Sequence, residues 1–161
     1  MSLEVLRFIE ELTRRGSHKE TGGILIGFHD GNDIRIIRAS DGGPNAKRSK
    51  CGFLRDTKFC QAVLDQEHAA SGGDYVGEWH THVVDLPRPS DGDLATLAGI
   101  ILDPDYGFPS FSMILGIKRA GIVEVRGYVV VETSQGGTAL AEQRDVRAVR
   151  VAQVTLEVSP L

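Results

Sequence analysis

The spacing of apolar residues divides the chain into short helices and strands. Apolar side chains recur at helical intervals through residues 3–12 and Gly16 follows, which predicts a helix at the start of the chain. Two β-rich runs, 22–28 and 34–38, flank an Asp-Gly turn and predict a hairpin. Residues 40–54 are polar and rich in glycine, so they are expected to form a loop.

A second helix is expected to begin at Asp56 or Thr57 and to run to about Ala70, where a Ser-Gly-Gly sequence ends it. Its inward-facing side chains are expected to be those of Phe59, Ala62, Val63 and either Ala69 or Ala70. This helix would join the hairpin to the strands and helices of the second half of the chain.

The second half mixes strands and helices in the same way. Residues 75–84 predict a strand, and a helix is expected to begin at Ser90 and to end before Pro104. A further strand pair is expected at residues 111–117 and 122–131. In the tail, residues 139–141 suit a helix while 149–158 alternate like a strand, and the two alternatives stay open.

The order of these elements predicts an α+β fold with a largely antiparallel sheet flanked by helices. At 161 residues the chain is expected to be a single domain, residues 1–161. Its formal charge of −4 lacks the positive footprint of a nucleic-acid-binding protein. No apolar run approaches the ~20 residues of a membrane span and no signal peptide opens the chain, so we expect a cytoplasmic protein without a membrane partner. Cys51 and Cys60 form no C-x-x-C pair and are expected to be free thiols.

His80 and His82 lie two residues apart in the predicted strand. Side chains at positions i and i+2 share one face of a strand, so both imidazoles can reach one metal ion, while Thr81 points to the other face. Two histidines in a half-exposed strand are equally often just polar side chains. The pair alone therefore leaves both interpretations open.

A Ser-x-x-Asp sequence, Ser90 to Asp93, begins eight residues after His82. This pattern is typical of a capping box, in which Ser90 is the N-cap and Asp93 binds exposed amide groups of the first helical turn. Asp93 can also supply an oxygen ligand to a metal ion at the end of the strand. The two roles are compatible, because a carboxylate in the first turn has an oxygen to spare.

Two nitrogen ligands and one oxygen ligand leave the fourth tetrahedral position open, as in a catalytic zinc site. Such a site needs a base that moves the proton of water. The candidates are Glu20, which precedes the glycine-bearing strand, and Glu78, which shares a strand face with the two histidines. Glu78 also qualifies as a metal ligand or as a partner that supports one. For both, the alternative is a solvated surface glutamate.

The pattern Glu…His-x-His-x7-Ser-x-x-Asp resembles the signature of the JAMM (JAB1/MPN/Mov34) zinc metallopeptidases, and its members here are Glu20, His80, His82, Ser90 and Asp93. The resemblance covers about residues 1–131 and leaves 132–161 as a tail without an assigned role. Two further stretches resemble the compact bacterial branch associated with ubiquitin-like conjugation operons: Gly43–Ser49 with Phe53 and Asp56, and Gly77–His82. The family usually has proline after the second histidine, where this chain has Val83.

This resemblance implies an MPN/JAB-like fold, similar in architecture to the cytidine deaminases, and one zinc ion bound by His80, His82 and Asp93. It implies Glu20 as the general acid/base toward the zinc-activated water and the leaving amine. Ser90 becomes a hydrogen-bond donor to the oxyanion. Glu78 and Thr81 are then candidates for supporting the ligands.

The implied reaction is hydrolysis of the bond after the C-terminal glycine of a ubiquitin-like protein. The implied partners are a ubiquitin-like or sulfur-carrier protein that ends in Gly-Gly and the activating- or conjugating-enzyme-like proteins of the same operon. Two alternatives stay open: a hydrolase that releases an amino acid such as cysteine from a sulfur-carrier protein, and a non-catalytic MPN scaffold or interaction module. The basic residues of and beside the 40–54 loop either contact an acidic partner or are simply solvated; they are Lys47, Arg48, Lys50 and Arg55.

Overall fold

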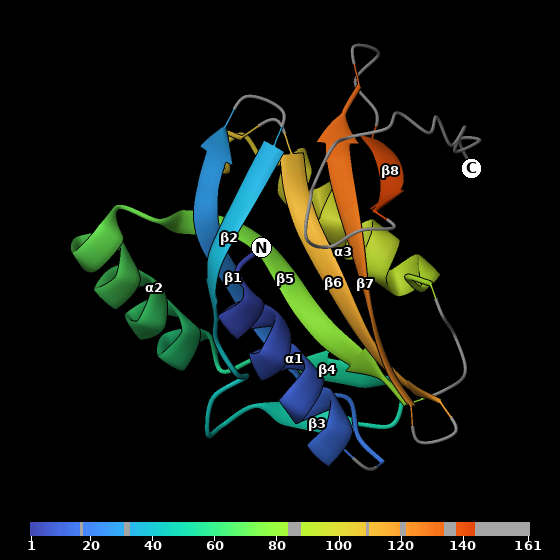
Figure 1. The fold of residues 1–161 in the computed structure, drawn as a ribbon. Coiled ribbons are helices and arrows are strands. Elements are labelled where there is room, and N and C mark those ends of the chain that lie inside the picture. Colours follow the sequence, from blue (N-terminus) through green and yellow to red (C-terminus); the bar gives the residue numbers. More distant parts are fainter. Residues whose placement is uncertain are drawn as a thin grey trace.

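The computed structural model describes residues 1–16, 18–30, 33–83, 88–108, 110–119, 122–133 and 138–143. Six strands of this part form a central sheet (Figure 1), in the spatial order β2 (Asp33–Ala39), β1 (Gly22–Asp30), β5 (Asp74–His82), β6 (Ser110–Arg119), β7 (Ile122–Glu132) and β8 (Thr138–Gln143). Neighbouring strands are antiparallel except for β5 and β6, which run parallel. The predicted α+β class with a largely antiparallel sheet is confirmed.

Helices cover both faces of this sheet. The helix α1 (Leu3–Arg15) packs on one face, while α2 (Thr57–Ser71) and α3 (Asp91–Ile101) pack on the other; Figure 1 shows α1 in front of the strands and α3 behind them. Successive side chains of a strand point to opposite faces, so each strand contributes to both layers. On β6, for example, Ile114 packs with the α1 side and Leu115 with the α3 side.

The second helix begins and ends as its sequence predicts, and Phe59 and Val63 face the sheet as expected, but the alanines do not. The Asp56 side chain accepts a hydrogen bond from the Phe59 amide at the N-terminus, and Gly72 ends the helix in the left-handed conformation. The buried side chain is Cys60, with Phe59 and Val63 half-buried beside it. The expectation that alanines face inward is wrong, since Ala62, Ala69 and Ala70 are exposed. Only the stripe of α2 around Cys60 reaches the sheet, where it packs on Ile24 and Ile26 of β1.

The segment 40–54 is not the plain loop that its polarity predicts. It contains a short antiparallel hairpin of β3 (Lys47–Ser49) and β4 (Gly52–Leu54). Within its turn, the Ser49 hydroxyl accepts a hydrogen bond from the Cys51 amide and donates one to the Gly52 carbonyl oxygen. Strands of three residues bury too little to impose an apolar alternation, which explains why the sequence pattern missed them.

Two other boundaries differ from expectation. The strand β5 ends at His82, so Val83 lies outside it, and residue 84 lies outside the described residues. The tail segment that suits a helix at 139–141 is a strand instead, because β8 pairs with β7. The possible strand at 149–158 lies outside the described residues.

Both cysteines are free thiols, as expected, with Cys51 exposed and Cys60 buried. Among the described residues, no helix is long and apolar enough to cross a membrane.

Candidate metal centre and catalytic site

The two histidines reach one face of the sheet because Trp79 anchors the opposite face. Trp79 is 1% exposed, and its indole N–H donates to the Ser40 carbonyl oxygen over 2.8 Å. Alternation along β5 then sends His80 and His82 to the face that α3 covers. Their Nε2 atoms lie 3.1 Å apart. His82 is buried and His80 half-buried.

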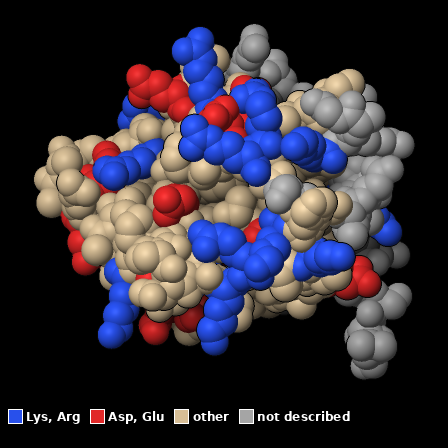
Figure 2. Space-filling view, turned by 90° about the horizontal axis from the view of Figure 1, so that it is seen from below, with Lys and Arg blue, Asp and Glu red and all other residues tan. Residues whose placement is uncertain are grey.

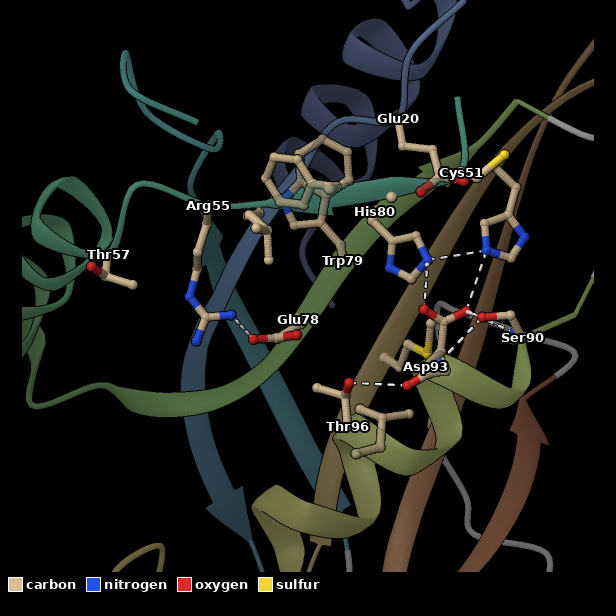
Figure 3. Close-up of a pocket in the computed structure, with 18 residues that line it drawn as sticks. Glu20, Cys51, Arg55, Thr57, Glu78, Trp79, His80, Ser90, Asp93 and Thr96 are labelled. Atoms are coloured by element: carbon tan, nitrogen blue, oxygen red, sulfur yellow. Dashed lines mark hydrogen bonds and ion pairs between the residues drawn. The ribbon is translucent and has the colours of Figure 1, made fainter. Parts of the chain in front are cut away.

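Asp93 is brought to these imidazoles by the capping box of α3. The Ser90 hydroxyl accepts a hydrogen bond from the Asp93 amide over 3.2 Å, and the Ser90 amide donates to Asp93 Oδ2 over 2.7 Å. The Ser90 hydroxyl also donates to Oδ2 over 2.7 Å. In Figure 3 the Asp93 carboxylate lies between Ser90 and His80. The first turn of α3 thus fixes both the position and the rotation of the carboxylate.

The spacing of these three side chains fits a metal ion. Asp93 Oδ1 lies 3.3 Å from His80 Nε2, and Asp93 Oδ2 lies 3.4 Å from His82 Nε2. An ion with tetrahedral ligands at ~2.0–2.1 Å spaces its ligand atoms about 3.3–3.4 Å apart. One ligand atom from each residue lies within 4.8 Å of the others. Two imidazole nitrogens and a carboxylate oxygen are also a donor set that zinc accepts.

The electrostatics of Asp93 favour its ionised form. Burial by itself raises the pKa of this carboxyl group, but hydrogen bonds from His80, His82 and Ser90 outweigh that effect. The net result is a pKa well below the usual range. Asp93 is therefore an anion at neutral pH, as a metal ligand must be.

Glu20 is held beside the centre by two neighbouring elements. Its amide donates to the Ser49 carbonyl oxygen of β3 over 2.8 Å. The next residue, Thr21, donates from its amide to Thr81 Oγ1 over 3.0 Å and accepts from the Thr81 amide over 2.7 Å. Glu20 is 8% exposed, and its side chain points toward His80 in Figure 3. Burial raises the pKa of Glu20, and attraction to His80 and His82 opposes that shift only in part.

A close contact between backbones sets β1 against the histidine strand. Gly22 pairs with His80, and a Cβ at Gly22 would lie 2.2 Å from the Trp79 carbonyl oxygen. Such a separation is far below any van der Waals contact. Glycine at this position therefore lets the strand that follows Glu20 lie directly beside the metal centre.

Glu78 occupies the same face as the histidines but has other partners. Its carboxylate forms an ion pair with Arg55 and accepts a hydrogen bond from the Tyr75 hydroxyl over 2.6 Å. Burial raises the pKa of Tyr75 to about 12, which keeps this hydroxyl a donor. Figure 3 shows Glu78 directed toward Arg55 and away from the group formed by His80 and Asp93. Thr81 lies on the opposite parity of β5, where it binds the Thr21 backbone.

A cavity of about 570 Å³ opens over the centre, and its lining includes Glu20, His80, His82, Ser90 and Asp93. Sequence reasoning did not assign its other walls to the site. One wall is the β3–β4 hairpin, through Cys51 to Leu54, and another is α3, through Thr96 and Leu97. The hairpin was missed because its strands are short. Thr96 sits one helical turn after Asp93, and that spacing was the available signal.

Fold and centre together define a class of protein: an α+β domain in which a strand and the start of a helix present a His-His-Asp group to a cavity. The chain belongs to the family of prokaryotic homologs of the JAB domain, which matches residues 3–151.

Relatives of this chain are named as hydrolases. A protein of Sinorhizobium fredii named probable metalloprotease y4qB is 36% identical over 100 residues, or 60% of this chain and 61% of that protein. A CD-NTase/cGAS isopeptidase of Escherichia coli is 31% identical over 73% of this chain and 75% of its own length. One of Enterobacter hormaechei is 31% identical over 74% of this chain and 67% of its own length. These names support a hydrolase of the peptidase or isopeptidase kind, and with the His-His-Asp group they suggest a bound metal ion.

Solved structures share the fold at low sequence identity. Protein DSY2949 of Desulfitobacterium hafniense superposes with a TM-score of 0.60 at 19% identity, covering 88% of this chain and 87% of that one. A protein of Salinibacter ruber gives a TM-score of 0.54 at 20% identity over 95% and 94% of the two chains.

Proposed function

We propose that this chain is a zinc-dependent isopeptidase that hydrolyses the bond after the C-terminal glycine of a ubiquitin-like protein. The observation that carries the proposal is the convergence of His80, His82 and Asp93 at metal-ligand spacing in a cavity that Glu20 also lines. A buried glutamate with a raised pKa beside such a group favours an enzyme over a scaffold. The isopeptidase relatives support a tagged protein as the substrate.

The residues that would hold zinc are His80, His82 and Asp93. When bound, zinc supplies Lewis acidity toward a carbonyl oxygen and toward water. Glu20 holds and moves the proton: its raised pKa brings the carboxylate closer to neutral pH, where a group both accepts and returns a proton efficiently. The proton accepted at the Glu20 carboxylate is then donated to the leaving amine.

Ser90 is the candidate donor to the oxyanion. Its hydroxyl donates to Asp93 Oδ2, so it must turn away from that oxygen to reach a substrate. The Ser90 amide keeps its own bond to Oδ2 meanwhile, so the carboxylate stays in place during the exchange.

The first experiment measures the metal and the turnover separately. Zinc content is expected to be one ion per chain, and His82→Ala is expected to abolish binding. Glu20→Gln is expected to keep the zinc but to lose about 10²–10⁴-fold in kcat, the usual contribution of a general base. The substrate is a ubiquitin-like protein fused through its Gly-Gly end to a lysine side chain.

The outcomes separate the alternatives. Cleavage of a cysteine adduct of a sulfur-carrier protein, without cleavage of the lysine isopeptide, would replace the isopeptidase with the amino-acid-releasing hydrolase. Zinc binding without turnover on either substrate would contradict an enzyme and leave a scaffold.

A further inference from the structure

Positive charge gathers on the segment that supplies one wall of the cavity. Residues 47–58 hold five basic side chains and one acidic side chain, although the whole chain has a formal charge of −4. The acidic residue, Asp56, is already engaged as the N-cap of α2. Figure 2 shows this end of the molecule, with lysine and arginine side chains gathered over it.

Two lysines of the hairpin carry exposed charge without a partner of opposite sign among the described residues, whereas the half-buried Arg48 is held by Thr21 and by backbone carbonyl oxygens. Lys47 and Lys50 are exposed, and the described part of the chain gives neither of them an acidic partner. Arg55 is different, because its guanidinium is paired with Glu78. Any segment that leaves the cavity over the hairpin therefore meets the two lysines without a competing carboxylate.

The surface that bears these lysines is open to a partner. Lys47 lies opposite Leu54 in the hairpin, and Leu54 is 66% exposed. The same Leu54 lines the cavity, so the lysine-bearing surface is continuous with the metal centre. On the other side, the start of α3 contributes the exposed Asp91. The two walls therefore differ in charge.

We propose that the hairpin wall selects substrates with acidic side chains immediately before the Gly-Gly end. This inference rests on the proposed function, because it puts the terminal glycine at the metal centre. An extended chain advances about 3.3 Å per residue, so the residues two to four positions before the terminal glycine lie about 7–13 Å away from the centre. Carboxylates in those positions lie against Lys47 and Lys50, whereas arginines in the same positions are repelled.

The test compares three fluorescein-labelled peptides that differ only in charge: Glu-Leu-Glu-Gly-Gly, Gln-Leu-Gln-Gly-Gly and Arg-Leu-Arg-Gly-Gly. Their binding to the full chain is measured by fluorescence anisotropy at low salt. The acidic peptide is expected to bind about fivefold more tightly than the arginine peptide, as two exposed charge pairs allow. The preference is expected to shrink in 0.5 M NaCl, where screening extends over only a few ångström.

Matched variants locate the effect. Lys47→Glu combined with Lys50→Glu is expected to reverse the preference. Arg7→Glu combined with Arg35→Glu changes the net charge equally on exposed side chains of α1 and β2, and it is expected to preserve the preference. Equal affinities for the three peptides, or tighter binding of the arginine peptide, would overturn the inference.

The same peptides linked to aminomethylcoumarin report hydrolysis, which tests the proposed function separately. An acidic preference in binding without any release of coumarin would contradict peptide-bond hydrolysis here and leave the charge selection intact. Release of coumarin from all three peptides at equal rates, with equal affinities, would support hydrolysis and contradict the charge selection.

Discussion

The Asp93 carboxylate is placed both for the helix cap and for the candidate metal centre. Oδ2 accepts hydrogen bonds from the Ser90 amide and hydroxyl and lies 3.4 Å from His82 Nε2, while Oδ1 lies 3.3 Å from His80 Nε2. The helix cap and the candidate ligand are therefore one structural unit, and Ser90 orients both. A sequence pattern that is ambiguous between a cap and a ligand is thus ambiguous for a physical reason, since this carboxylate is placed for both roles.

Ser90→Ala is expected to lower the free energy of unfolding by about 1 kcal/mol, the usual effect of removing an N-cap hydroxyl. Zinc affinity is expected to fall in parallel, because the carboxylate loses one of the bonds that orient it. Thermal unfolding and competition with a chromophoric chelator measure the two effects. Ser90→Thr keeps the hydroxyl and is the control; a Ser90→Ala protein with unchanged zinc affinity would contradict the coupling.

We expect His29 to give the stability of the fold a dependence on pH that is separate from the candidate metal centre. Its ring stacks on Phe108 at 4.4 Å between centroids, and its Nε2 is buried without a hydrogen-bond partner among the described residues. Burial lowers the pKa of His29, and the charge of Asp74 offsets that shift only in part. The neutral ring is therefore the form that the folded protein prefers.

Below about pH 6.5 the unfolded chain takes up this proton while the folded chain resists it. Stability is consequently expected to fall as the pH drops through that value. His29→Phe preserves the stacked ring and is expected to flatten this part of the profile. Urea unfolding at pH 7.5 and pH 5.5 measures the free energy of unfolding of both proteins. An equal loss of stability between the two pH values in the wild type and in His29→Phe would refute the assignment.

At the scale of elements, the backbone approach of β1 to β5 positions Glu20 against the histidines. Gly22→Ala brings a Cβ to within 2.2 Å of the Trp79 carbonyl oxygen, and backbone cannot move aside as a flexible side chain does. We expect a loss of about 3 kcal/mol or more in the free energy of unfolding, together with loss of zinc. The matched control is Gly52→Ala in the hairpin, where the nearest atom to a new Cβ is Ser49 Oγ at 3.6 Å. Similar unfolding midpoints for the two variants would contradict this account.

Much of the architecture can be predicted from the sequence. Apolar periodicity and caps predict α1, the β1–β2 hairpin, the bounds of α2 and the start of α3. The centre is predicted only in part by these patterns, because strand parity places His80 and His82 on one face while the capping pattern leaves Asp93 ambiguous between a cap and a ligand. The β3–β4 hairpin cannot be predicted in this way, since it is held by hydrogen bonds in its turn and by the bond from the Glu20 amide to the Ser49 carbonyl oxygen. The sequence pattern also does not predict the ion pair of Glu78 with Arg55, because the two residues are far apart in the chain and meet only in the folded protein.

At the scale of the whole molecule, the centre joins two elements separated by a crossover. The strands β5 and β6 are parallel neighbours, and the chain between them carries α3 with Asp93. In this fold α3 packs on β6 and β7, so Asp93 is positioned only when those strands have paired. Because long-range strand pairing is slow, we expect the His-His-Asp group to assemble late in folding.

Refolding with Co²⁺ in place of zinc tests this order. Trp79, the single tryptophan, precedes His80 and reports both burial and the arrival of a quenching ion. The visible absorption of tetrahedral Co²⁺ is expected to appear only in the last kinetic phase, together with quenching of Trp79. Absorption that precedes burial of Trp79 would show that the ligands assemble before the sheet.

The parallel junction also bears on the nascent chain at the ribosome. When β5 has emerged, two imidazoles are available but the Asp93 carboxylate is not yet anchored, because α3 packs on β6 and β7, which are made later. A nascent or truncated polypeptide that lacks β6 and β7 is therefore expected to have no hydrolytic activity. Nearby proteins are then not cleaved before synthesis has passed β7.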